Sequence, residues 1–321
     1  MKQNATENLV GRTKSATQSN TICMLSIALF AIGFPAADML LETWGVISLV
    51  TARVVLACSL MMPLWILIDG RAQIMNAPWL RALGIGALGF GSGTILLLVV
   101  QDMTDPISAA LIAATMPVSA IILEILFDGR RLTKNFMAGT VLVLTGGFLA
   151  TGAVLQEGPF GSATLLGGLA SVMFAWGSRQ AVKGLPELTS FGQATATLIG
   201  AMAFCILTFT AFKFMAWEGT ETAALGSWGW SMLLIYAWGA LAISQAFWIL
   251  GVSRLGIGIA SFHLNAAPFY VMLILLFAGG SWDWTRALGA AVLGLGVVLA
   301  QKHQVYMIYA KSNHHEVLSD Q

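Results

Sequence analysis

ICMLSIALFAIGFPAADML, residues 22–40, is the stretch that decides the fold, because it is apolar along nearly its whole length. A helix of about 20 apolar residues crosses the ~30 Å hydrocarbon core of a bilayer. Similar blocks recur along the chain, in which 57% of the 321 residues are hydrophobic and 10% are charged, whereas about a quarter are charged in soluble domains. The sequence therefore predicts an all-α integral membrane protein.

Ten such blocks predict ten transmembrane helices, and the charges between them predict the orientation. Arg71 and Arg81 follow the second block, and Arg130, Arg131 and Lys134 follow the fourth, whereas the odd-numbered connections are mostly acidic. Loops rich in Lys and Arg stay in the cytoplasm, so both termini are expected there. The predicted spans are Ile22–Leu40, Trp44–Ile68, Trp79–Val100, Pro106–Phe127, Phe136–Leu155, Ser162–Val182, Phe191–Phe212, Trp228–Gly251, Ile257–Gly279 and Arg286–Lys302.

An internal repeat divides the chain into two halves. FAIG at residues 30–33 matches FAWG at 174–177, and Pro117 matches Pro268 after one insertion. Each half holds five predicted spans, an odd number, so the second copy enters the membrane in the opposite orientation. Inverted repeats of this kind commonly build secondary transporters. The predicted organisation is a polar cytoplasmic tail at 1–19, five-helix repeats at 20–155 and 156–302, and a cytoplasmic tail at 303–321.

The order of these features resembles the drug/metabolite transporter superfamily, specifically its EamA-type members of bacterial inner membranes. The resemblance covers about Ile22–Lys302 and rests on the two five-span copies, Arg53 in the second span, the Trp176-Gly177 element, and the Pro117 and Pro268 segments. It implies a multi-pass inner-membrane transporter that moves an amino acid, a related metabolite or an amphiphilic drug by alternating access, with export favoured over uptake.

One feature departs from the family pattern. Family members often close the fourth and ninth spans with a Gly-Glu pair, whereas this chain has Gly129-Arg130 and Gly280-Ser281. Any gating role of that Glu would then fall to Asp128 and Asp283, which lie close by.

Enzyme and metal motifs are absent from the sequence, so neither catalysis nor a cofactor or metal is expected. The GxGxxG pattern at 84–89 lies inside a predicted span, where it indicates a small-residue surface for helix packing, and Gly89 and Gly93 form GxxxG. The only basic clusters are short and lie beside membrane blocks, which argues against nucleic acid as a partner. The three cysteines stand singly and predict no disulfide.

Charged side chains inside a membrane are costly, so each is a functional candidate. Arg53 lies about 13 Å below the outer surface, near the bilayer midplane. It is either a tie between helices or a contact for an anionic substrate group. Its partner would be Asp38, backbone carbonyls at helix ends of the first half, or the substrate. Glu124 lies near the cytoplasmic end of the fourth span, and it and Asp38 are predicted to act in gating or coupling.

Two prolines mark where the helices bend. Pro117 and Pro268 lack the N–H that would bond the carbonyl four residues earlier, so we expect each to kink its helix beside a central cavity. His263 and Asn265 precede Pro268 and are predicted to bind substrate. For His263 a proton relay and a hydrogen bond to a neighbouring helix both stay open.

Gln245 and Trp176 complete the predicted substrate-binding set, Gln245 as a polar group that cannot face lipid and Trp176 as a stacking surface. Arg179, near an inner helix end, is expected to snorkel to the cytoplasm.

The resemblance places the cavity between spans one, three, four, six, eight and nine. The expected partners are a small-molecule substrate and the lipid bilayer, with a coupling proton or ion and a homodimer left open. An uptake permease and a non-transporting membrane sensor or assembly protein are the alternatives.

Overall fold

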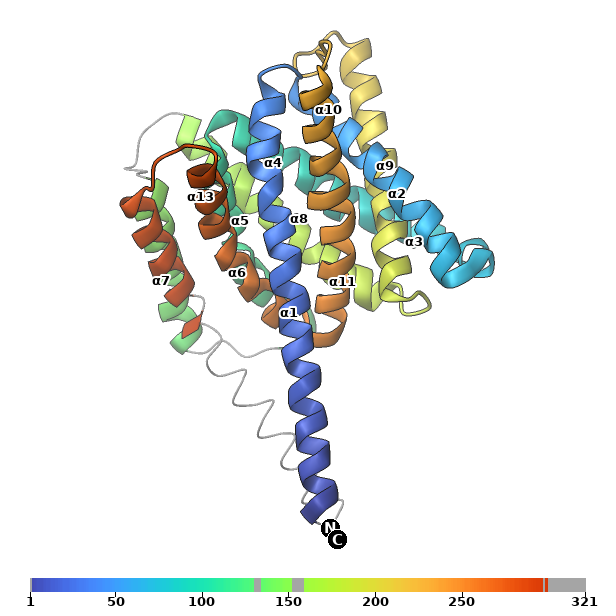
Figure 1. The fold of residues 1–321 in the computed structure, drawn as a ribbon, viewed down its shortest axis with the longest axis vertical. Helices are drawn as coiled ribbons and strands as arrows, with labels where there is room; N and C mark the ends of the chain where they lie inside the picture. The colour runs from blue at the N-terminus through green and yellow to red at the C-terminus, as the bar shows by residue number, and fades with distance from the viewer. Residues whose placement is uncertain (1, 130–133, 152–158, 297, 300–321) are drawn as a thin grey trace.

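The structure is a computed structural model that describes residues 2–129, 134–151, 159–296 and 298–299. Within these ranges all regular structure is helical, which confirms the predicted class (Figure 1). Seven helical segments are long and apolar enough to cross a membrane: Thr17–Leu41, Val46–Met75, Trp79–Met103, Pro106–Asp128, Ser190–Phe214, Ser227–Leu255 and Ile257–Phe277. They coincide with predicted spans one to four and seven to nine.

Three further helices occupy the places of predicted spans five, six and ten. They are α7 (Lys134–Thr151), α8 (Pro159–Gly184) and a helix over residues 284–296. α8 is long enough to span but is rich in glycine and serine and carries Arg179, which lowers its hydropathy. Residues 152–155 and 300–302 of the predicted spans, and the predicted tail 303–321, lie outside the described residues.

The first helix, α1 (Lys2–Leu41), begins far earlier than its apolar block. The segment predicted as a polar tail at 1–19 is therefore helical from Lys2 onwards, and Figure 1 shows it projecting from the bundle. Its sequence contains Ala, Glu, Gln and Lys, which favour helices, and no proline. α2 (Val46–Met75) turns sharply at Gly70, where φ is 79°, and α9 (Ser190–Phe214) is continuous.

Four of the spans are interrupted, and the interruptions fall at equivalent places in the two halves. The third and eighth spans each contain a π-helical segment, and the fourth and ninth are broken near their middle. Their parts are α3 (Trp79–Ile85), η1 (Gly86–Gly91) and α4 (Ser92–Met103); α10 (Ser227–Leu234), η2 (Ile235–Ile243) and α11 (Ser244–Leu255); α5 (Pro106–Ala113) and α6 (Met116–Asp128); and α12 (Ile257–Ala260), η3 (Ser261–Ala266) and α13 (Ala267–Phe277).

The prolines explain the breaks in the fourth and ninth spans. Pro117 and Pro268 stand in the first turn of α6 and α13, where a missing N–H costs nothing. The carbonyl of Leu264, which Pro268 cannot bond, is not left free: it accepts the N–H of Ala267 at the end of the 3₁₀ segment η3. The ninth span is therefore interrupted by a tight 3₁₀ turn in which the carbonyl of Leu264 keeps a hydrogen bond.

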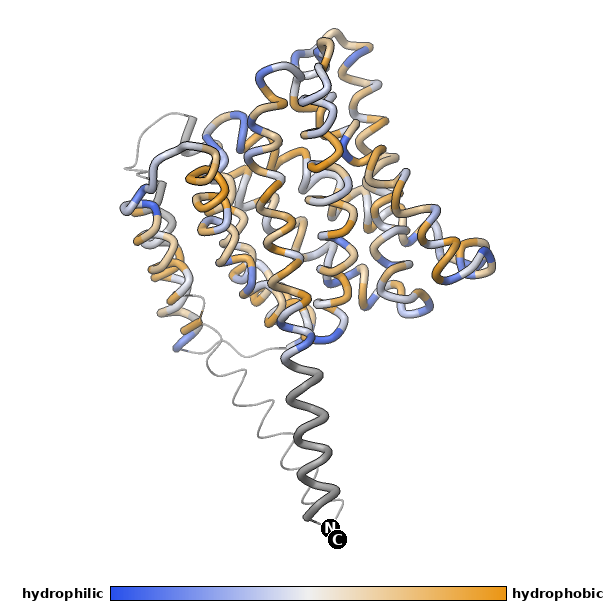
Figure 2. The backbone as a smooth tube through the Cα atoms, in the orientation of Figure 1, coloured by the Kyte–Doolittle hydropathy of each residue, from blue (hydrophilic) through white to orange (hydrophobic). Residues whose placement is uncertain are grey.

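Connections that were predicted to share a side of the membrane lie at the same end of the bundle. At one end Arg81 pairs with Glu187 at 2.7 Å, and Thr189 donates to Asp69 at 2.6 Å. At the other end the N–H of Gly45 donates to the carbonyl of Glu221. Hydrophilic segments concentrate at these ends and hydrophobic ones between them (Figure 2).

Small residues let the central helices approach closely, as the glycine run predicted. A Cβ added to Gly89 would lie 2.5 Å from the Cα of Gly177 in α8, and one added to Gly93 would meet the ring of Phe174. Gly86 faces α9 in the same way. α7 and the helix over 284–296 lie side by side at the edge of the bundle, and neither belongs to the spans that the resemblance places around the cavity (Figure 1).

Candidate functional site

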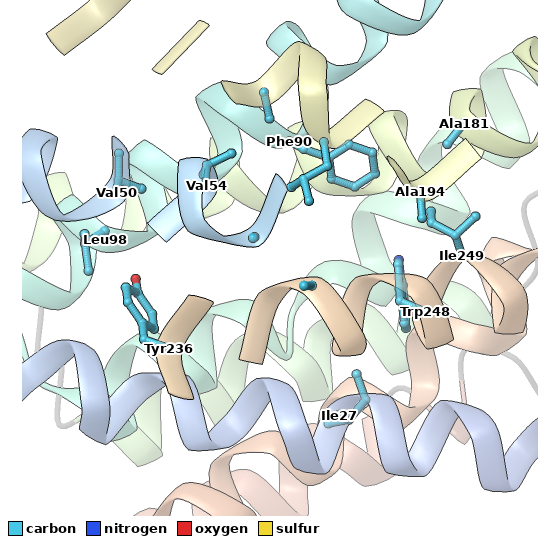
Figure 3. Packing of buried hydrophobic residues seen from close by; sticks show 14 of the residues in the cluster. Ile27, Val50, Val54, Phe90, Leu98, Ala181, Ala194, Tyr236, Trp248 and Ile249 are labelled. Carbon is cyan, nitrogen blue, oxygen red and sulfur yellow. The ribbon is translucent and has the colours of Figure 1, made fainter. Parts of the chain in front are cut away.

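A cavity of about 60 Å³ lies in the middle of the bundle. Phe90, Trp248 and Ile27 border it from three different helices (Figure 3). The elements that line it are α1, η1, α4, α5, α6, α8, α11 and η3, which belong to spans one, three, four, six, eight and nine. This is the set of spans that the family resemblance implies. Ligand sites commonly measure about 300–1,000 Å³, so a metabolite needs a wider conformation than this one.

Residues that the predicted repeat aligns with each other lie together in the cavity wall. Phe30 and Phe174, which the repeat aligns, both line it, and so do Ala113 and Leu264, which stand four residues before the paired prolines. The backbone just before each of the two prolines thus reaches the cavity wall. The prolines themselves are buried behind it.

The polar groups of the cavity are hydroxyls and one amide. The Ser26 hydroxyl donates to the carbonyl of Ser244 at 2.8 Å, and the Ser244 hydroxyl donates to the carbonyl of Ser26 at 3.0 Å, which ties α1 to α11. The indole N–H of Trp248 donates to the Ser178 hydroxyl at 2.9 Å. Gln245 Nε2 is buried and has no hydrogen-bond partner among the described residues.

Arg53 lies in a separate, smaller cavity of about 20 Å³ that shares the side chains of Phe30 and Leu97 with the central one. The guanidinium donates from Nε to the carbonyl of Tyr236, from Nη2 to the carbonyl of Ala240 and from Nη1 to the Tyr236 hydroxyl, each at 3.2 Å. It also lies over the Tyr236 ring, 3.9 Å from the ring centroid. The partners of Arg53 are thus in the π-helical segment η2.

These contacts correct the expectation for the partner of Arg53. Asp38 is an exposed side chain at the end of α1 and is not among the hydrogen-bond partners of the guanidinium. The carbonyls that accept from Arg53 come from the second half of the chain and from the middle of a span, because a π-helix displaces carbonyls from the regular bonding pattern. Sequence reasoning gave no signal for that π-helical segment.

Two carboxylates of α6 join the fourth span to its neighbours near the predicted cytoplasmic end. Glu124 Oε1 accepts from the N–H of Gly258 at 3.1 Å, next to the start of the ninth span. Asp128 accepts from Arg179 Nη2 at 2.6 Å and Nε at 3.1 Å, and from Lys183 Nζ at 2.6 Å. Arg179 is only 9% exposed, so it is a buried ion-pair partner rather than a side chain that snorkels freely to water.

At the opposite end, hydrogen bonds link different spans. Gln101 Nε2 donates to the carbonyl of Phe34 at 2.7 Å, which joins α4 to α1. Arg286 Nη1 pairs with Asp105 at 2.6 Å, and its Nε lies 3.3 Å from Asp283. Asp128 therefore joins two helices through Arg179, whereas Asp283 contacts Arg286 at the start of its own helix and the bond between helices at this end is made by Asp105.

Three of the predicted binding residues lie away from the central cavity. His263 and Asn265 line a wide groove of about 760 Å³ between α1, η3 and the helix over 284–296. His263 Nδ1 lies 3.0 Å from the carbonyl of Ala260, within its own helix. Trp176 packs in the apolar core, whereas Gln245 does line the central cavity.

The sequence left out most of the cavity wall. Phe30, Phe90 and Phe174 were not proposed as binding residues, and Ser26 and Ser178 were not singled out. The repeat itself held a usable signal, because Phe30 and Phe174 open its two matching motifs. Within the described ranges, no group of three or more His, Cys, Asp and Glu side chains could hold a metal ion.

The apolar helices and their arrangement are those of a multi-pass membrane protein with a cavity among its spans. Residues 19–152 match the EamA-like transporter family, which confirms the resemblance over the first five-helix segment and indicates a transporter of the drug/metabolite type. A solved structure titled "Crystal structure of protein" is similar with a TM-score of 0.69 at 16% identity, over 88% of this chain and 97% of that chain. At that identity the likeness shows the fold alone. No curated protein matches the chain.

Proposed function

We propose that the chain is a secondary transporter of two inverted five-helix repeats, which moves a small metabolite across the bacterial inner membrane by alternating access. The observation that carries the proposal is the central cavity, because the two repeats line it with equivalent residues, Phe30 with Phe174 and Ala113 with Leu264. Two similar halves of opposite orientation can exchange roles and open one shared site to either side. The proposed direction is export, with both termini cytoplasmic, and it rests on the family resemblance.

Contacts on both sides of the cavity support a closed intermediate in such a cycle. Near the predicted outer side, Gln101 joins the first span to the third, and closer to the midplane Arg53 joins the second span to the eighth. Near the predicted inner side, Glu124 and Asp128 join the fourth span to the ninth and sixth. Breaking one set while keeping the other would open the cavity to one side only. This assigns the gating role of Glu124 to its bond with Gly258.

Of the predicted binding residues, we retain Gln245 for direct substrate contact, since it alone among them borders the central cavity. Arg53 is assigned a structural role through its bonds to η2. His263, Asn265 and Trp176 are assigned roles in helix packing. A coupling proton or ion would act through the carboxylates at the helix ends, which are the titratable groups that bridge separate spans.

Reconstitution in proteoliposomes tests the transport proposal. A panel of amino acids, their amides and aromatic amphiphiles is first screened for ligands that raise the thermal midpoint of the purified chain, because a ligand of the native state stabilises it. Radiolabelled hits are then measured in counterflow. We expect exchange in the wild type and none in Ala113→Phe, which fills the cavity, whereas Leu165→Phe on the exposed face of α8 keeps it. Ligand binding without counterflow would support the sensor alternative instead.

A further inference from the structure

The central cavity is aromatic and carries no ionised side chain. Its lining, all of it within the described ranges, consists of apolar residues, serines and one glutamine, and Phe30, Phe90, Phe174 and Trp248 supply rings on several sides. Transfer of an isolated charge into such surroundings is costly unless a partner of opposite charge is present. Arg53, which lines the adjoining cavity, already donates to two carbonyls and a hydroxyl.

The hydrogen-bonding groups of the cavity are also largely committed. Ser26 and Ser244 donate to each other's carbonyls, and Ser178 accepts from Trp248. Gln245 Nε2 is the exception, since it is buried without a partner in the described part of the chain. A buried donor that stays unbonded costs about 1–3 kcal/mol. The amide of Gln245 is therefore a donor that a bound molecule can satisfy.

We infer that the molecule bound in the central cavity, in a conformation wider than this one, is electrically neutral, with an apolar body and a hydrogen-bond acceptor that bonds to Gln245 Nε2. The aromatic wall receives the apolar body, and the amide nitrogen fixes the orientation of the acceptor. This inference rests on the proposed function for its biological meaning, but it concerns binding and can be tested without transport. It excludes a net anion or cation as the preferred substrate.

Four probes of similar shape separate the contributions of charge and acceptor. They are 4-phenylbutan-2-one, which is neutral with a carbonyl; butylbenzene, which lacks an acceptor; 3-phenylpropionate, an anion; and 3-phenylpropylammonium, a cation. Calorimetric titration of the purified full chain in detergent gives the affinities. We expect the ketone to bind at least about tenfold more tightly than each of the others, since one net hydrogen bond is worth about that factor.

Two substitutions then identify the donor. Gln245→Leu should lower the affinity for the ketone about tenfold and leave butylbenzene unchanged. Gln245→Glu replaces the donor by an acceptor-only carboxylate, so the order should reverse in favour of the ammonium probe. Gln73→Leu, which removes a glutamine amide near the predicted cytoplasmic end, is the matched control and should leave the order unchanged.

The inference is overturned if a charged probe binds the wild type most tightly, if the ketone does not bind at all, or if Gln245→Leu binds the ketone as well as the wild type does. Counterflow keeps this result separate from the proposed function. Binding of the ketone through Gln245 without flux of any probe would leave the inference standing and remove the transport proposal. Flux of a charged probe in preference to the ketone would support the transport proposal and overturn the inference of a neutral substrate.

Discussion

Arg53 is the residue for which the sequence left two roles open, a tie between helices and a contact for an anionic substrate group. The side chain is buried, and its guanidinium is held by two carbonyls, a hydroxyl and a ring face, which favours the tie. The repeat places Thr197 at the equivalent position, where the hydroxyl donates to carbonyls of its own helix. The tie from α2 to η2 therefore exists on one side of the pseudo-symmetric bundle only.

We expect Arg53→Met to lower the free energy of unfolding by about 2–4 kcal/mol, because it leaves the carbonyls of Tyr236 and Ala240 without their donor. Arg53→Lys should be intermediate, since an ammonium lacks the planar fork that reaches both carbonyls. Tyr236→Phe keeps the ring and should cost about 1 kcal/mol. Denaturation in mixed detergent–SDS micelles measures all three. A stable Arg53→Met protein that fails to bind 4-phenylbutan-2-one would instead return Arg53 to the binding site.

Asp105 is a second residue with several partners, and it lies outside the membrane-spanning segments. One carboxylate oxygen accepts from the N–H groups of Ile107 and Ser108 at the start of α5 and from Arg286. Burial raises the pKa of this carboxyl, but the bonds from Ser108 and the charge of Arg286 outweigh that effect, so the pKa lies below its ordinary value. The ionised form is the one that the fold stabilises.

The sign of the pH dependence follows from that lowered pKa. Asp105 stabilises the fold fully above its unfolded pKa, near 3.9, and the stabilisation is lost as pH falls through the folded pKa. Asp105→Asn should therefore unfold more readily at pH 7, by about 1–2 kcal/mol, with the difference from wild type shrinking as the pH falls below about 4. Thermal midpoints across this pH range measure the effect, and Asp102→Asn at an exposed position is the control. An equal difference at pH 7 and pH 3 would contradict this linkage.

At the scale of elements, glycine sets how closely the spans can pack. In the third span Gly89 meets the backbone of α8, whereas Gly84, in the preceding helix α3, has no atom near its would-be Cβ. The sequence predicted this small-residue surface because a dinucleotide-binding GxGxxG must follow a strand, whereas this one lies inside a transmembrane span. It did not predict the π-helical segments η1 and η2, since their hydrogen-bond pattern depends on neighbours such as Arg53 rather than on local residue preference.

Gly89→Ala should lower the free energy of unfolding by about 1–3 kcal/mol, because its Cβ would lie 2.5 Å from the Cα of Gly177 and force the helices apart. The added Cβ of Gly84→Ala would lie in open space, so this substitution should change the free energy of unfolding by less than about 1 kcal/mol. A gain in helix propensity is its only other effect. Denaturation of the two purified variants under one set of conditions compares them. Equal losses in the free energy of unfolding for the two variants would show that the close approach of η1 and α8 does not contribute to stability.

At the scale of the whole molecule, the sequence predicts what depends on composition and period, and misses what depends on side-chain direction. The apolar blocks predicted helices where the structure has them, and the fourth and ninth spans are broken near Pro117 and Pro268. The same reasoning placed His263 with the central site because it stands near Pro268. The 3₁₀ segment η3 places its side chain in the outer groove instead. The direction in which a side chain such as His263 points can be known only from the packed structure.

The orientation of the bundle can be tested with single cysteines, because the native Cys23, Cys58 and Cys205 are all buried. Thr222, between α9 and α10, and Arg71, near the end of α2, are both exposed. The charge distribution predicts that Thr222 faces outward and Arg71 faces the cytoplasm. A membrane-impermeant maleimide added to intact cells should therefore label Thr222→Cys and spare Arg71→Cys.

Inverted membrane vesicles should reverse this labelling, and the unmodified chain should stay unlabelled in both preparations. Because an odd number of spans separates the two positions, both cannot face the same side if each span crosses the membrane. Labelling of both from one side would mean that one helix between residues 71 and 222 does not cross. The five-helix repeat, and with it the inverted arrangement that supports alternating access, would then have to be abandoned.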